Sequence, residues 1–172
     1  MKLTEHFDVA QVWGHPKAIP TQEQIRTCYV GARTILEPLR VAMECPIIVT
    51  CGYRTPEDNK RVEGAAKSEH TFGAASIGLE KFEGAWDINL TPNTDHGLRL
   101  RAYRWLMQSC RHSIGQLIWY LETGHLHVSL AGPRHAGEFL CCVSKARSDY
   151  RLVKNPADIV ALDPRLKSVV VS

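Results

Sequence analysis

Five polar residues, far apart in the chain, have the types that metal-assisted amide hydrolysis requires: Arg54, His70, Asp87, His125 and His127. Two histidines and a carboxylate are a common ligand set for a catalytic zinc ion, which takes three protein ligands and keeps a fourth position open. A further histidine can transfer protons. An arginine can hold a carboxylate through two parallel hydrogen bonds. Together the five predict a zinc hydrolase.

Taken singly, each signal also has a structural explanation. The sequence His125-Leu126-His127 reads as part of a strand, where residues i and i+2 share one face. Such a pair is more often a surface pair or a pair of core histidines than a pair of ligands. Asp87 falls between Trp86 and Ile88 in a predicted strand, where an unpaired charge would be costly. A salt bridge to one of the arginines satisfies it as well as a metal does.

Two candidates fall in a long segment without sustained periodicity, residues 51–77. Arg54 follows a predicted strand directly, and His70 precedes Gly73, which permits a tight turn or a close backbone approach. Alone, they read as a structural ion-pair residue and an ordinary loop histidine. Loops of this length inside a compact domain are usually functional, however.

The elements that must position these residues predict an α+β fold. A helix with the Thr21/Gln24 capping pattern carries an apolar stripe to about residue 43, with Pro38 expected to kink or split it. A second helix is predicted from a Thr94 cap to about residue 111. Strands are predicted at 47–50, 85–90, 116–121, 125–130 and 138–144. We therefore expect a small antiparallel sheet with the zinc ligands on one face, packed against two main helices.

Composition excludes several classes of protein. The 172 residues contain 44% hydrophobic and 23% charged residues, which is ordinary for a globular domain. The net charge of +3 is too small and scattered to indicate a nucleic-acid partner. No segment is long and apolar enough to span a bilayer, and the N-terminus lacks a signal-peptide core, so synthesis in the cytoplasm is expected. Nothing indicates an oligomeric state.

The six cysteines show no disulfide framework. Cys45 and Cys51 flank a predicted strand that would hold them roughly 20 Å apart, beyond disulfide reach. Cys141 and Cys142 are adjacent and would point to opposite faces of a strand. Free, buried or half-buried thiols are therefore predicted.

Several ordered pieces of the chain resemble one family. The runs TCGYRTPEDNKRVEGAAKSEHTFG, GAWDINL and GQLIWYLETGHLHVSL are similar to those of the zinc D-Ala-D-Ala carboxypeptidases, metallopeptidases that cut peptidoglycan peptides and share their fold with the Hedgehog signalling domain. The family pattern is roughly S-G-Y-R, then S-x-H-x-x-G-x-A-x-D, then a strand with H-x-H or W-x-H. The resemblance covers about residues 3 to 145 and points to the His-x-His subgroup.

The resemblance implies a role for each candidate. His70, Asp87 and His127 would bind one Zn²⁺ ion. His125 would be the acid/base or transition-state-stabilising histidine, and Arg54 would clamp the substrate carboxylate or the developing oxyanion.

The chain also departs from the family pattern. The aspartate is expected seven residues after the first histidine, where Ile77 stands, so we interpret residues 75–84 as an insertion. Glu80 and Glu83 are the alternative carboxylate ligands if Asp87 does not bind the metal. Gly124 stands where some relatives carry a catalytic glutamate, which leaves Glu122 as a weak reserve base. Cys51 replaces the family's serine.

The sequence thus predicts zinc-dependent hydrolysis of an amide in peptidoglycan stem or cross-link peptides, either D-Ala-D-Ala carboxypeptidase-like or endopeptidase. The catalytic domain is expected over 1–145, followed by a C-terminal extension of unknown role, 146–172. The absence of a signal suits a phage or prophage lysin that reaches the wall at lysis. Two alternatives stay open: an inactive metal-binding module for wall recognition, and a zinc hydrolase of a non-wall D-amino-acid dipeptide.

Overall fold

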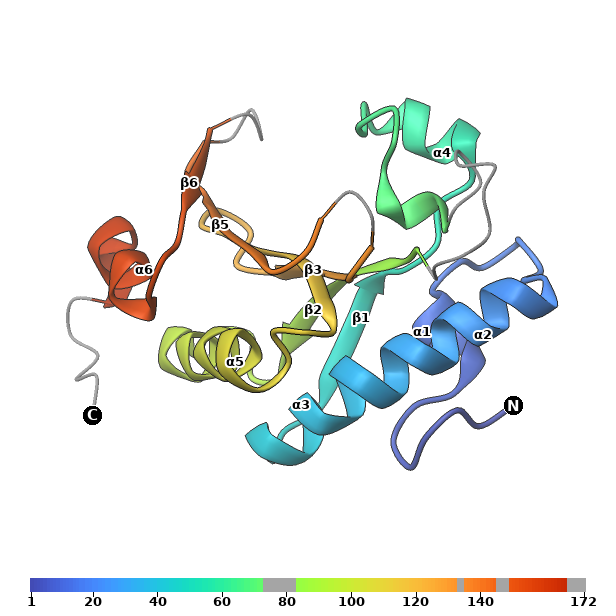
Figure 1. The fold of residues 1–172 in the computed structure, drawn as a ribbon, viewed down its shortest axis with the longest axis horizontal. Coiled ribbons are helices and arrows are strands. Elements are labelled where there is room, and N and C mark those ends of the chain that lie inside the picture. Colours follow the sequence, from blue (N-terminus) through green and yellow to red (C-terminus); the bar gives the residue numbers. More distant parts are fainter. Residues whose placement is uncertain (73–82, 133–134, 145–148, 167–172) are drawn as a thin grey trace.

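The computed structural model describes residues 1–72, 83–132, 135–144 and 149–166. Its centre is a six-stranded sheet in the order β1-β2-β4-β3-β5-β6 (Figure 1). The strands are β1 (Ile47–Cys51), β2 (Ala85–Leu90), β3 (Ile114–Tyr120), β4 (Leu126–Leu130), β5 (Glu138–Cys142) and β6 (Tyr150–Leu152). Neighbours are antiparallel except β3 and β5, which run parallel. The predicted α+β class is confirmed, with this one parallel pair as a difference.

The first main helix is nearly continuous from residue 22 to residue 43. It comprises α2 (Gln22–Gly31), a π-helical segment (Ala32–Leu36) and α3 (Glu37–Met43). The predicted capping box is present, because the Thr21 hydroxyl accepts a hydrogen bond from the Gln24 backbone N–H and the Gln24 side-chain oxygen accepts one from the Thr21 backbone N–H. Pro38 falls in the first turn of α3, directly after the π segment, so the chain accommodates the missing N–H without breaking the helix.

The second main helix is α5 (His96–Ser109). Its N-cap is Asp95, whose carboxylate accepts the Leu98 backbone N–H at 2.8 Å, so the expected Thr94 cap was wrong by one residue. The shorter helices are α1 (Val9–Trp13), α4 (Pro56–Arg61) and α6 (Pro156–Leu162), with 3-10 turns at Glu69–Thr71 and Pro164–Leu166.

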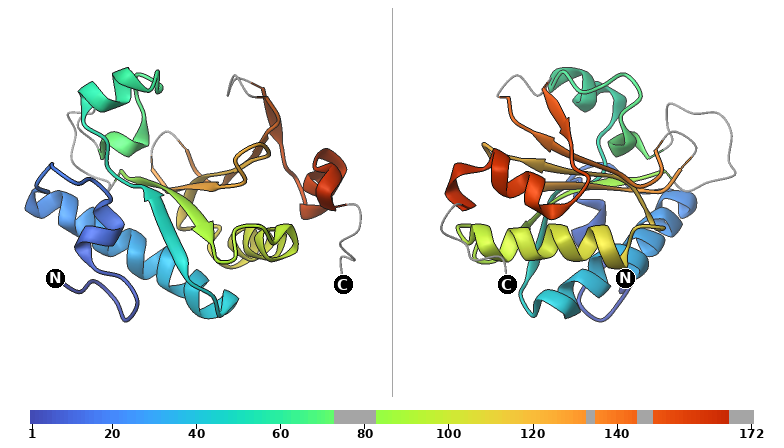
Figure 2. Two further views of the ribbon diagram at one scale, coloured as in Figure 1. Left: turned by 180° about the vertical axis from the view of Figure 1, so that it is seen from behind. Right: turned by 60° about the vertical axis from the view of Figure 1, so that its left-hand side comes forward.

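The two main helices cover one face of the sheet, and α4 lies on the opposite side (Figure 2). On β2, Trp86 and Ile88 point into the helix-covered core and are fully buried. The Trp86 indole N–H donates to the Val12 carbonyl at 2.9 Å, and its ring lies against Gly31, where a Cβ would come within 2.1 Å. The alternation of the strand therefore leaves Asp87 on the uncovered face.

The C-terminal residues continue the same sheet and core. Strand β6 pairs with β5 in antiparallel register, and α6 contacts α5. Val153, Ile159 and Leu166 are buried in the main hydrophobic cluster. Residues 150–166 therefore pack onto the sheet that carries the candidate site.

All six cysteines are free thiols, four of them buried, as predicted. Among the described residues, none of the helices has the length and apolarity needed to cross a membrane. The predicted insertion falls largely at 73–82, outside the described residues, as does Glu80.

Candidate metal centre

Strand pairing brings Asp87 and His127 together. The two residues are direct partners in the β2–β4 ladder, and His127 Nδ1 lies 3.0 Å from Asp87 Oδ1. Paired positions on one face of an antiparallel sheet have Cβ atoms about 4.5–5.5 Å apart, which allows both side chains to bind one metal ion. The sheet register alone thus supplies an imidazole and a carboxylate.

The third candidate ligand, a second imidazole, comes from the 3-10 turn Glu69–Thr71. His70 is buried, and its Nδ1–H donates to the Gly52 carbonyl at 2.7 Å. Gly52 must be glycine, because a Cβ there would lie 2.5 Å from the carbonyl oxygens of Val12 and Trp13. This hydrogen bond directs His70 Nε2 towards Asp87, as outer-shell partners commonly do for metal-binding histidines.

The three candidate ligand atoms converge. His70 Nε2 lies 3.4 Å from Asp87 Oδ1 and 3.2 Å from His127 Nδ1. Zinc bonds of about 2.0–2.2 Å in tetrahedral geometry place neighbouring ligand atoms about 3.3–3.6 Å apart. The spacing of these three atoms therefore fits a zinc ion with little rearrangement.

The group is also electrostatically coupled. For His70, burial lowers the pKa, but the charge and hydrogen bond of Asp87 and the nearby Cys51 outweigh it and raise the pKa to about 9. For Asp87, burial raises the pKa, whereas His70 and His127 together hold it well below its ordinary value. A half-buried carboxylate that is held ionised beside two imidazoles marks a candidate functional site and is a suitable ligand for a cation.

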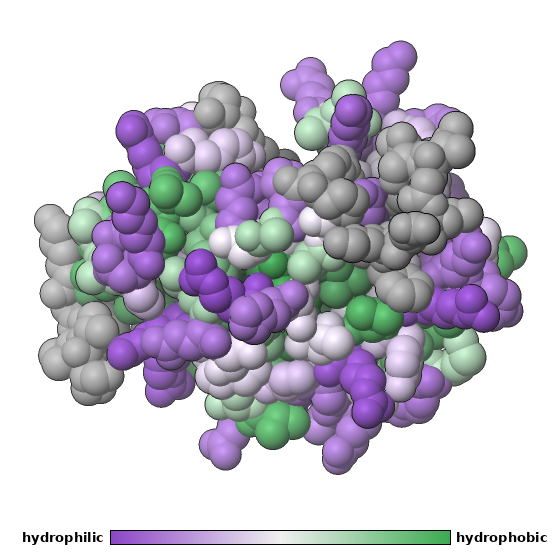
Figure 3. All heavy atoms as spheres, in the orientation of Figure 1, coloured by the Kyte–Doolittle hydropathy of each residue, from purple (hydrophilic) through white to green (hydrophobic). Residues whose placement is uncertain are grey.

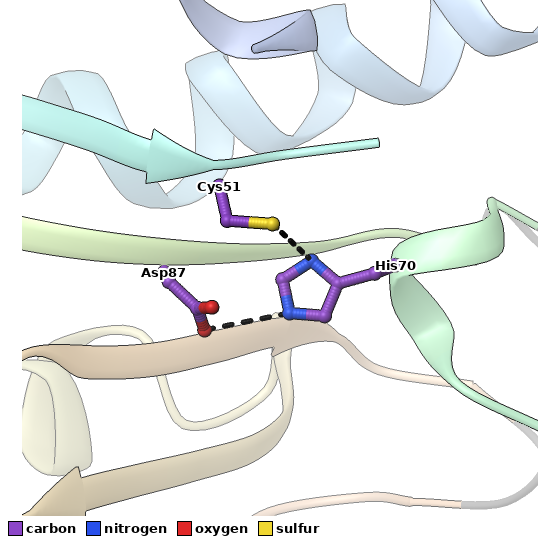
Figure 4. A group of neighbouring side chains, drawn as sticks. All are labelled: Cys51, His70 and Asp87. Carbon is purple, nitrogen blue, oxygen red and sulfur yellow. Dashed lines mark hydrogen bonds and ion pairs between the residues drawn. The ribbon is translucent and has the colours of Figure 1, made fainter. Parts of the chain in front are cut away.

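Cys51 also lies beside this group, although sequence motifs did not indicate Cys51 as a ligand. A β-bulge after Val49 places Cys51 opposite Asp87, and its sulfur lies 3.8 Å from His70 Nδ1 (Figure 4). Cys51, His70 and Asp87 could hold a metal by proximity. However, Cys51 and Asp87 face different nitrogens of the imidazole, and Nδ1 already donates to Gly52. The set with His127 uses only Nε2 of His70.

The predicted strand began at His125, but β4 begins one residue later, at Leu126, so His125 directly precedes the strand. Its Nε2 lies 3.9 Å from Asp87 Oδ1, so both imidazoles of the His-x-His sequence approach one carboxylate. The Thr123 hydroxyl contacts His125 Nδ1 at 2.5 Å, and the Tyr120 ring stacks on the imidazole with centroids 4.4 Å apart. His125 is thereby held at the edge of the group.

Arg54 approaches from the loop after β1. Its Nη2 lies 3.8 Å from Asp87 Oδ2, the oxygen that does not face the imidazoles. The backbone N–H of Arg54 donates to the His70 carbonyl at 2.8 Å, which ties the two loop candidates together. The structure therefore brings all five sequence-predicted residues to one place.

These residues open into a cavity of about 510 Å³. One side is built by the loop after α4, including Gly64 and Lys67, and the other by β3, β5 and β6; Figure 3 shows a notch in the molecular outline between them. Tyr150 of β6 and His135 also line it, and neither was among the candidates inferred from sequence motifs. Glu122 and Glu83 are not among the described residues that line the cavity.

A family model described as Peptidase M15 matches residues 15–129, which include every one of the five candidates. The chain belongs to the peptidase M15 family. The match confirms the resemblance inferred from the sequence motifs and makes the chain a metallopeptidase of this family. No curated protein matches the chain. The family match ends before β5 and β6, so the cavity wall that carries Tyr150 lies outside it.

Proposed function

We propose that the protein is a zinc-dependent peptidase that hydrolyses an amide bond in peptidoglycan stem or cross-link peptides. The convergence of His70 Nε2, Asp87 Oδ1 and His127 Nδ1 within 3.0–3.4 Å of one another is the observation that carries this proposal. These three atoms would hold one Zn²⁺ ion. When bound, zinc would polarise the scissile carbonyl and lower the pKa of a water ligand to about 7.

His125 would transfer a proton to the leaving amine. Its Nδ1 is engaged by Thr123, which leaves Nε2 as the nitrogen on the side of Asp87, and the residue lines the cavity. Hydrolysis breaks the C–N bond, and the departing nitrogen needs a proton at that moment. A positioned acid is typically worth about 10²–10⁴ in rate.

Arg54 would bind negative charge on the substrate. Its guanidinium lines the cavity beside the group, where it can hold either a peptide carboxylate or the oxygen that becomes negative as the carbonyl is attacked. A carboxylate at Arg54 would favour cleavage near a peptide C-terminus, as in a D-Ala-D-Ala carboxypeptidase. An endopeptidase would use Arg54 for the oxyanion alone.

The test uses purified cell walls and a D-Ala-D-Ala-terminated stem peptide. We expect new free amines or free D-alanine to appear, to vanish with a chelator and to return with added zinc. Free D-alanine identifies a carboxypeptidase, and new internal amines identify an endopeptidase.

Binding to walls without amine release would favour an inactive recognition module, and cleavage only of a free D-amino-acid dipeptide would favour a non-wall hydrolase. Lysis of whole cells from outside would support a role as a phage lysin.

A further inference from the structure

The Arg54 guanidinium is held from three directions. Its Nε donates to Cys51 Sγ at 3.2 Å, and its Nη1 donates to Asn59 Oδ1 at 3.3 Å. Its Nη2 faces Asp87 Oδ2 at 3.8 Å. An unrestrained arginine side chain would lose rotamer entropy when it orders around a substrate. These contacts fix it beforehand.

Asn59 is built to present an oxygen to Arg54. It is only 5% exposed although it lies on the short helix α4. Its Nδ2 donates to the Ala65 carbonyl at 2.9 Å, which orients the amide so that Oδ1 faces Arg54. The chain leaves no room for a side chain at Gly64, where a Cβ would lie 2.2 Å from Asn59 Oδ1. A buried amide with both ends engaged has one orientation.

Cys51 supplies the second acceptor. The β-bulge in β1 places it opposite Asp87, so its sulfur lies between the strand and the Arg54 side chain. The thiol is a weak acceptor, and a serine hydroxyl at the same position would be a stronger one. The hydrogen bond from Arg54 gives Cys51 a function that does not require it to touch a metal.

We propose that Cys51 and Asn59 are positioning residues, which aim the remaining N–H groups of Arg54 into the cavity. The inference rests on the proposed hydrolysis for its kinetic consequence, but the contacts of Cys51 and Asn59 with Arg54 exist whether or not the protein hydrolyses a wall peptide. Neither residue contacts the substrate through this role, and both act through Arg54.

The kinetic experiment compares Asn59→Ala, Cys51→Ala and Cys51→Ser, each alone and combined with Arg54→Ala, on the substrate that the wild type cleaves. We expect Asn59→Ala and Cys51→Ala each to lower kcat/KM about tenfold, with zinc content unchanged, and Cys51→Ser to stay within about threefold of the wild type. In the Arg54→Ala background each substitution should change kcat/KM by less than about twofold. A full additional loss in that background would overturn the proposal.

Two further readouts separate positioning from other roles. Loss of zinc from both Cys51→Ala and Cys51→Ser would make Cys51 a metal ligand and overturn its assignment. Because Asn59→Ala removes a buried amide and can unfold the α4 loop, the Cys51→Ala and Cys51→Ser pair provides the decisive comparison if that variant does not fold.

The positioning can also be tested without turnover. In zinc-loaded protein, the Nε–H proton of Arg54, followed through its ¹⁵N-correlated NMR signal, should exchange slowly with solvent. Its exchange should become fast in Cys51→Ala but not in Cys51→Ser. An unchanged exchange rate in Cys51→Ala would overturn the proposal even if the protein is an active peptidase. Slow exchange in a protein that cleaves no wall peptide would instead leave the positioning standing and remove the proposed function.

Discussion

Asp87 and His127 are cross-strand partners on β2 and β4, with the carboxylate oxygen Oδ1 3.0 Å from the imidazole Nδ1. One hydrogen-bonded ladder therefore sets the separation of two candidate ligands. The third, His70, is attached to this pair by its bond to the Gly52 carbonyl, since Gly52 follows β1 and β1 pairs with β2. A rigid sheet with one anchored loop is a suitable frame for a metal ion.

His127→Ala should abolish zinc occupancy and activity together. The substitution removes one of three converging ligand atoms and leaves Asp87 and His70 without their shared partner. Elemental analysis of the purified variant measures the metal, and amine release measures activity. His112→Ala, on an exposed residue, is the control and should retain both. Full zinc in the His127 variant would contradict its assignment as a ligand.

His125→Ala should keep most of the zinc but lose about 10²–10⁴ in kcat. Its Nε2 lies 3.9 Å from Asp87, farther than the nitrogens of His70 and His127, which suits a proton carrier better than a ligand. Steady-state kinetics at matched zinc content test this. A rate near the wild type would show that Glu122 or water supplies the proton.

Arg54→Ala should lower kcat/KM by about 10²–10³ and change stability little. The reason is that a cation beside a developing oxyanion is worth several kcal/mol, whereas partly exposed ion pairs usually contribute about 0–1 kcal/mol to folding. Kinetics and thermal unfolding should be measured on the same preparation. Arg101→Ala, on the exposed surface of α5, is the matched control. A large fall in melting temperature with an unchanged rate would favour a purely structural ion pair.

Tyr150→Ala should raise KM severalfold while zinc content stays unchanged. Tyr150 lines the cavity from β6, and its hydroxyl lies 3.4 Å from that of Tyr120, whose ring stacks on His125. Loss of a wall that contacts substrate equally before and during reaction raises KM without lowering kcat. Leu152→Ala, also exposed on β6, should leave KM unchanged. Identical kinetics for the two variants would remove β6 from the substrate site.

The ionised Asp58 side chain should stabilise the folded protein above about pH 4, and this stabilisation should disappear in acid. The hydrogen bonds from His15, Thr55 and Arg61 lower the pKa of Asp58 to about 2 in the folded chain, against about 3.9 when unfolded. The stabilisation is therefore fully present above the unfolded value and is lost as pH falls from about 4 to about 2. Urea midpoints of the wild type and Asp58→Asn should differ at pH 7 and converge near pH 2. Glu57→Gln, an exposed neighbour on α4, serves as control. A difference that persists at pH 2 would refute this linkage.

Local pattern was sufficient to predict much of the framework. The capping box at Thr21 and Gln24 and the strand from Ala85 to Leu90 follow from hydrogen-bonding chemistry and residue alternation within a few positions. The alternation also places Asp87 and Trp86 on opposite faces of the strand, so the sequence alone distinguishes a polar face from a core face. The family motifs, with their spacing, were enough to identify the M15 peptidases.

Other features depended on long-range packing. The exact cap of α5, at Asp95 rather than Thr94, and the parallel pairing of β5 with β3 are decided by how neighbouring elements meet. The C-terminal strand β6 has no strong pattern of its own and is placed by pairing with β5. Propensity is weak in such short segments, and tertiary context overrides it.

Residue type and strand alternation are local properties, so the side chains that could do chemistry were recognisable in the chain before it folds. That His70, Asp87 and His127 meet within 3.4 Å, and that Cys51 and Asn59 hold Arg54 beside them, became apparent from the folded chain. Those contacts join residues distant in the chain, so they depend on sheet register, a β-bulge and a buried glycine carbonyl, none of which a local pattern encodes.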